Sequence, residues 1–156
     1  MRAFIVLALI ALLLGCTSTR TSPGKAALVV DFVNSTVIKK CVEFGENATA
    51  LTLLESSGLS IQTKTDPAFG PGLCGIEGIG CPPSNCFCGG NRYWGFYYDS
   101  DDGNWSYSNV GVGAVFDGNR TIVRDGALIG FRWGEFGQLP EQASFESICG
   151  PSTKQN

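Results

Sequence analysis

The chain has 156 residues, with 14 Asp and Glu against 11 Lys and Arg, and it contains no His. This length suits one ordinary domain, and without a basic patch nucleic acid is not an expected partner. The lack of His removes the commonest general base, so we expect no enzyme and assign no catalytic residue. The 21 Gly and ten Phe indicate a turn-rich β protein with an aromatic core.

The chain begins with a short apolar segment. Arg2 precedes an apolar run over residues 3–14, which continues directly into Gly15 and Cys16. A basic start before an apolar run is typical of a secretory signal, and this run is too short to span a bilayer. The small residue before Cys16 resembles a prokaryotic lipobox, which implies cleavage before Cys16 and lipid on its thiol. We therefore predict a signal peptide over residues 1–15 and a lipid anchor at the outer face of the cytoplasmic membrane or the cell surface. A soluble secretory signal is the alternative.

A polar segment follows. Residues 16–25 are rich in Ser, Thr, Pro and Gly, and we expect them to form a tether between the lipid and the domain. The domain is predicted over residues 26–134. It opens with β-branched, apolar runs over residues 27–33 and 37–44, which we expect to pair as a β-hairpin.

The spacing of apolar residues then becomes helical. Asn47 is a good N-cap, an apolar stripe runs from Ala48 to Leu54, and Gly58 suits the position after a helix. The sequence therefore predicts a short helix over residues 48–57, the only one expected in the exported protein.

The rest of the domain reads as strands and turns. The segment with the most aromatic residues, 92–99, is a strong strand, and 124–126 is a hairpin-type turn. Other extended segments are expected over residues 59–65, 73–79, 105–107, 111–116, 121–123 and 127–133. Residues 66–72 are expected to be a loop and 135–156 an irregular tail.

This order predicts an α+β fold. A hairpin followed by a helix that packs across the sheet is the opening of a β-grasp. We therefore expect a β-grasp-like mixed sheet with one packed helix, stapled by disulfides.

Cysteine parity supports export. The chain has seven Cys, and assigning Cys16 to lipid leaves an even number. The remaining six suit three disulfides in an oxidising compartment; they are Cys41, Cys74, Cys81, Cys86, Cys88 and Cys149. A zinc site in the crowded region from Cys74 to Cys88 is the less favoured alternative. Spacing does not choose the connectivity.

Asn-X-Ser/Thr sequences suggest glycosylation. Four of the eight Asn head such a sequence, and an attached glycan requires a surface position. The four are Asn34, Asn47, Asn104 and Asn119. The alternative is that some of them are turn and cap residues.

Aromatic residues between Tyr93 and Tyr107 are the best candidates for binding. In a strand, Trp94, Phe96 and Tyr98 share one face, which we assign to the core. The other face leaves an aromatic platform for a flat ligand, a sugar or a partner protein. Its members are Tyr93, Tyr97, Trp105 and Tyr107. An equal alternative is that these four residues simply pack in the sheet beneath the Cys-rich loop expected over residues 81–90.

Acidic residues gather in one turn. Asp99, Asp101 and Asp102 could offer oxygen ligands to Ca²⁺, but the run lacks the length and closing Glu of an EF-hand. A solvated hairpin turn is the better interpretation, and no metal site is predicted.

Several short motifs resemble the transcobalamin C-terminal-like domain. They are the helix that ends at Gly58, the Gly-rich stretch 74–79, Tyr93-Trp94 and the closing stretch 123–133. The segment 81–88 and the ending 145–149 resemble a Cys-rich subgroup of prokaryotic, often lipid-anchored members. The resemblance implies a ubiquitin-like β-grasp and, by analogy, cobalamin or another corrinoid as ligand. The large helical cobalamin-binding domain of transcobalamin has no counterpart here. Ala127 also stands where many members carry an acid.

We therefore expect a non-enzymatic lipoprotein whose β-grasp domain binds a ligand or partner, with corrinoid capture or delivery to a transporter component as the specific hypothesis. The alternative is a structural or interaction module of the cell envelope that binds protein or glycan. A hydrolase is the least favoured class.

Overall fold

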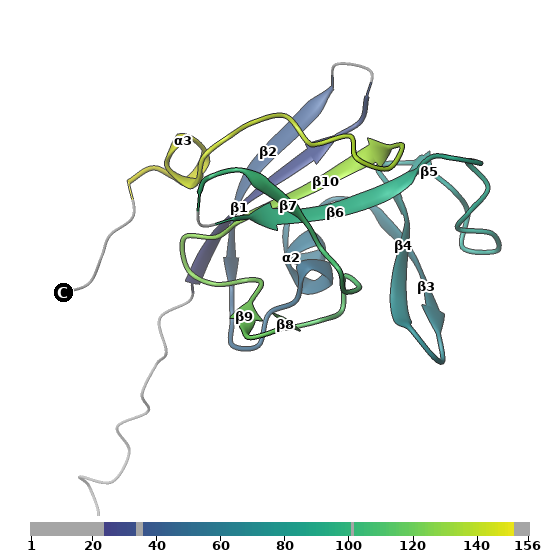
Figure 1. Cartoon of the computed structure of the whole chain (residues 1–156), viewed down its shortest axis with the longest axis horizontal. Helices are drawn as coiled ribbons and strands as arrows, with labels where there is room; N and C mark the ends of the chain where they lie inside the picture. The colour runs from purple at the N-terminus through teal and green to yellow at the C-terminus, as the bar shows by residue number, and fades with distance from the viewer. Residues whose placement is uncertain (1–23, 34–35, 101, 152–156) are drawn as a thin grey trace, which may run out of the picture.

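A mixed sheet forms the centre of the molecule (Figure 1). The computed structural model describes residues 24–33, 36–100 and 102–151; the predicted signal peptide, Cys16 and Asn34 lie outside these ranges. The sheet has five strands in the order β2-β1-β10-β6-β7. These are β1 (Gly24–Asp31), β2 (Val37–Phe44), β6 (Tyr93–Asp99), β7 (Trp105–Tyr107) and β10 (Leu128–Gly134).

The two central strands, β1 and β10, run parallel, whereas the pairs β1–β2, β10–β6 and β6–β7 are antiparallel. The segment from Ala26 to Asp31 is buried throughout, as expected for a strand covered on both faces. The predicted hairpin of β1 and β2 and the α+β, β-grasp-like class are confirmed.

One face of the sheet is covered by helix α2 (Ala50–Ser56), which buries Leu53 and Leu54 (Figure 1). The predicted start of this helix was wrong. Thr49 is the N-cap: its hydroxyl accepts from the Thr52 amide at 3.1 Å. Asn47 instead has a φ of 55° and belongs to the preceding turn.

The main core lies between α2 and the sheet. Trp94, Phe96 and Tyr98 point into it, which confirms their predicted assignment. Phe96 stacks on Phe131 of β10 with ring centroids 5.3 Å apart. Leu28 and Val30 of β1 fill the same layer and are fully buried.

The opposite face carries a second, smaller core made by the end of the chain. The predicted irregular tail contains a helix, α3 (Phe145–Cys149), whose N-cap Ser144 accepts from the Ser147 amide. Phe145 packs there with Tyr97 and Trp105. We expected no second helix because five residues are too few to show a helical period.

The remaining strands form two small sheets. They are β3 (Ile61–Asp66), β4 (Gly70–Ile76) and β5 (Ile79–Gly80) in one sheet, and β8 (Phe116–Asp117) and β9 (Arg120–Thr121) in the other. The loop expected over residues 66–72 is shorter, because the Asp66 carboxylate accepts from the amides of Ala68 and Phe69 and closes a tight β3–β4 turn. The turn at 124–126 does not join a hairpin: Gly126 donates to the Lys25 carbonyl, and β10 then runs parallel to β1.

Phe145→Ala should lower the free energy of unfolding by about 3–5 kcal/mol, because Phe145 is the buried side chain by which α3 enters the second core. Chemical denaturation of the oxidised protein measures this. Phe69→Ala, at a fully solvated turn, is the matched control and should change stability by less than about 1 kcal/mol. Equal effects of the two changes would contradict the second core.

Candidate functional site

A pocket of about 300 Å³ opens beside the first half of β6. Strand β7 pairs with Tyr97, Tyr98 and Asp99, and the Ser108 amide just after it donates to the Phe96 carbonyl at 2.9 Å. This pairing does not extend to the strand edge from Tyr93 to Gly95. The pocket lies at this edge and is mainly apolar, with five aromatic residues in its walls. Its walls include Leu73, Phe87, Tyr93, Trp94, Phe96 and Tyr107. We call it the aromatic pocket.

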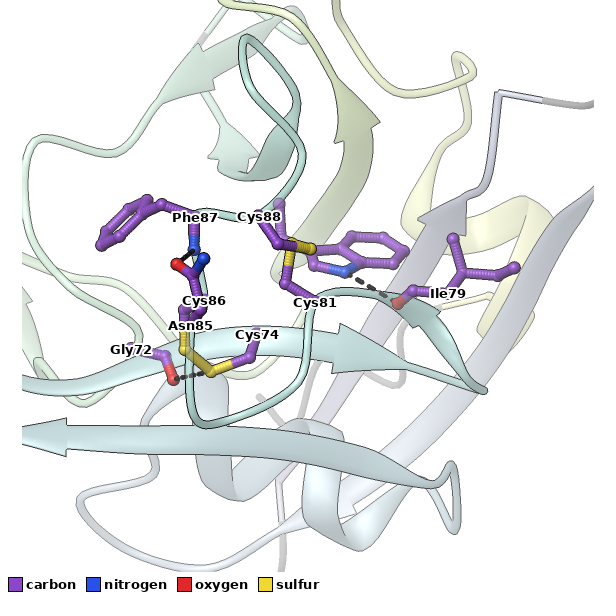
Figure 2. The surroundings of a disulfide bond; sticks show 9 residues. Gly72, Cys74, Ile79, Cys81, Asn85, Cys86, Phe87 and Cys88 are labelled. Carbon is purple, nitrogen blue, oxygen red and sulfur yellow. Dashed lines mark hydrogen bonds between the residues drawn. A yellow bond between two sulfur atoms is a disulfide. The ribbon is translucent and has the colours of Figure 1, made fainter.

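The loop over residues 81–92, here the Cys-rich loop, forms one wall of the aromatic pocket and is held by two disulfides (Figure 2). Cys86 is bonded to Cys74 of β4, and Cys81 is bonded to Cys88. The third bond joins Cys41 on β2 to Cys149 at the end of α3. All six predicted cysteines are therefore paired, and none of these sulfurs is a thiolate that could bind zinc.

Two of the four predicted platform residues line the pocket. Tyr93 is half-buried, and Tyr107 is 40% exposed. The ring centroids of Tyr107 and Phe136 are 5.5 Å apart. Burial, followed by the neighbouring Tyr107, raises the pKa of Tyr93 to about 12. Tyr93 is therefore a neutral phenol over the whole physiological range, with an apolar ring and a hydroxyl that can donate or accept.

The other two are placed differently from the prediction. Tyr97 and Trp105 are 2% and 7% exposed, and they lie in the second core beneath the C-terminal segment rather than on an open platform. The Tyr97 hydroxyl donates to the carbonyl of Gln138 at 2.8 Å. The predicted alternation of side chains along β6 is confirmed, because Tyr97 lies on the face opposite to Trp94, Phe96 and Tyr98. This second face is covered by the C-terminal segment, which is distant in sequence.

Sequence reasoning missed Phe87. This residue lines the pocket and is 82% exposed, and it is not among the binding candidates predicted from the sequence. Its position between two cysteines was the available signal, because a residue between two disulfide anchors has a fixed backbone.

A second, polar hollow of about 370 Å³ lies between the β6–β7 turn and the start of α3. Two of its charged groups are paired with each other: the Asp99 carboxylate accepts from Arg124 at 2.8 Å, and it also accepts from the Leu128 amide at 3.0 Å. A hydrogen bond from Ser100, followed by those from Asn104, lowers the pKa of Asp102 to about 2. This turn is internally bonded, and within the described residues no group of three or more His, Cys, Asp or Glu could hold a metal. Asp101 lies outside those residues.

The remaining predicted sites are on the surface. Asn47, Asn104 and Asn119 are exposed, as a glycan would require, and their glycosylation stays a prediction. Among the residues that the structure describes, no helix has the length and apolar character needed to cross a bilayer.

Comparison with known proteins supports the fold. No protein-family model and no curated protein matches the sequence. The structure is similar to the crystal structure of haptocorrin in complex with Cbi, with a TM-score of 0.51 and 15% sequence identity. The match covers 74% of this chain and 26% of the haptocorrin chain. The chain therefore has a distant transcobalamin-like fold and spans about a quarter of that protein.

Tyr93→Phe should make stability less sensitive to alkali. An unfolded Tyr loses its proton near pH 10, whereas folded Tyr93 keeps it to about pH 12, so the folded state loses its advantage as the pH rises through this interval. Denaturation midpoints across the same interval should fall less steeply for the variant than for the wild type. Identical slopes would show that Tyr93 titrates normally.

Proposed function

We propose that this chain is a non-enzymatic extracytoplasmic binding protein, anchored by lipid on Cys16, whose aromatic pocket holds one face of a corrinoid. The observation that carries the proposal is an aromatic pocket, open to solvent and walled by a disulfide-bonded loop, on a fold similar to that of haptocorrin, whose crystal structure contains Cbi. The disulfides suit the oxidising space outside the cytoplasm.

The chemistry of the pocket suits a flat macrocycle fringed with amides. Aromatic rings such as Phe87 and Tyr107 offer apolar area, and the neutral hydroxyl of Tyr93 can hydrogen-bond to an amide. The chain has no His, so no imidazole would coordinate the corrinoid metal. Binding would rest on contact and hydrogen bonds.

The size of the pocket favours capture and delivery over permanent enclosure. A volume of about 300 Å³ is at the low end for sites that bury most of a drug-sized ligand. A macrocycle would be held at one face and remain reachable elsewhere. Such exposure suits transfer to a transporter component.

A second candidate is an interaction module of the cell envelope that binds protein or glycan. The observation that favours it is the number of large apolar side chains on the surface. Phe69, Phe87, Phe116 and Phe136 are all more than half exposed. Aromatic side chains of this kind are common anchors in protein interfaces.

Calorimetric titration of the oxidised mature chain with cobinamide should show saturable binding. Tyr107→Ala should weaken it by about tenfold, because one aromatic wall of the pocket is lost. Phe116→Ala removes an exposed ring that does not line the pocket, and its affinity should equal that of the wild type. Absence of saturable binding would reject the corrinoid function and favour the envelope module.

Cys16→Ala should abolish lipid attachment and release or mislocalise the protein, because the thiol is the proposed acceptor of the lipid. Membrane fractionation and intact-mass measurement test this. A Cys16→Ala protein that still requires detergent for extraction would show that the anchor is elsewhere.

A further inference from the structure

Phe87 combines exposure with a fixed position. It lies at the rim of the aromatic pocket with 82% of its side chain exposed, and Figure 2 shows its ring projecting away from the two disulfides of the Cys-rich loop. A single exposed Phe is ordinary on a protein surface. What distinguishes Phe87 is how tightly its backbone is held.

Covalent and hydrogen bonds restrain the loop on both sides of Phe87. Cys86 is bonded to Cys74 and Cys88 to Cys81. We call residues 86–88 with their two disulfides the clip. Asn85 reinforces the clip because its side-chain oxygen accepts from the Phe87 amide at 3.2 Å (Figure 2). The Asn85 carbonyl also accepts from the Cys88 amide at 3.2 Å. Exposure of Phe87 therefore does not result from a loose loop.

The chain also turns back tightly just after the clip. A Cβ added at Gly89 would lie 2.7 Å from the Arg92 carbonyl and 3.1 Å from the Trp133 ring. Only a residue without a side chain permits this approach. The loop is thus fixed against the sheet immediately beyond Cys88.

Each of the two disulfides of the clip contributes less to global stability than the third disulfide. They close short segments, with sequence separations of 12 and 7, whereas Cys41–Cys149 has a separation of 108. The loss of unfolded-chain entropy grows with the length of the closed loop. The short bonds also act locally, because they fix the backbone that carries Phe87.

We propose that Phe87 is the principal apolar contact of the aromatic pocket, and that Cys74–Cys86 and Cys81–Cys88 are positioning elements that hold its ring ready for a flat apolar ligand. A ring fixed before binding loses less conformational entropy when the ligand arrives. The inference rests on the proposed binding function and adds the residue that makes the main contact with the ligand and the disulfides that position it.

The test uses the oxidised mature chain and two probes, cobinamide and the aromatic dye anilinonaphthalene sulfonate. Phe87→Ala should weaken binding of both probes by about tenfold or more, and Phe87→Trp should restore most of the affinity. Phe116→Ala is the matched control, since Phe116 is also exposed but does not line the pocket, and it should bind as the wild type does.

A double-mutant cycle tests the positioning role. Cys81→Ser/Cys88→Ser leaves the other two disulfides and Phe87 in place. Thermal unfolding verifies that this variant is folded. Phe87→Ala should lower the affinity by a several-fold smaller factor in this variant than in the wild type. The reason is that the ring is no longer fixed in the variant and already contributes less to binding. Equal costs in both backgrounds would overturn the positioning role.

Phe87→Ala with wild-type affinity for both probes would overturn the proposal, as would a wild-type chain that takes up neither. Dye binding that depends on Phe87 without any cobinamide binding would uphold Phe87 and reject the corrinoid function. The two failures are therefore distinguishable.

Discussion

The carboxylate of Asp31, at the end of β1, joins the three parts of the chain that must meet. It is buried, pairs with Arg132 on the neighbouring strand β10, and accepts from the Glu141 amide at 3.0 Å. A buried charge is costly unless it is paired and hydrogen-bonded, and here the partners come from β10 and the C-terminal segment. The same interaction that neutralises Asp31 therefore directs the tail across the second face of the sheet.

The molecule has two cores because the C-terminal segment covers the face of the sheet opposite α2. Tyr97, Trp105 and Phe145 bury each other there, and Gly130 leaves room for the contact. A Cβ at Gly130 would lie 2.8 Å from the Trp105 ring and 2.9 Å from Pro140. The long-range disulfide Cys41–Cys149 then fixes the end of α3 to the edge strand β2. Residues 135–151 thus pack on the folded sheet, although their composition indicates an irregular segment.

The features of this fold that depend on neighbouring residues could be predicted from the spacing and type of those residues. The β1–β2 hairpin, the α+β class and the core positions of Trp94, Phe96 and Tyr98 follow from alternation and β-branched residues. Cysteine parity predicted three disulfides but not their partners, because pairing depends on which strands become neighbours. The burial of Tyr97 and Trp105 could not be predicted either, since it depends on a segment about forty residues away in sequence.

Because both faces of the sheet are covered, a flat ligand could reach it at an edge only. With α2 on one face and the C-terminal segment on the other, Tyr93 is the aromatic residue of β6 that is partly exposed, at the start of the strand, which β7 is too short to reach. Tyr93 and Tyr107 line the pocket from the sheet, and the Cys-rich loop completes it with Phe87. Two short-range disulfides at this place fix the backbone of the pocket wall. The positions of the disulfides and of the uncovered strand edge thus favour the same site.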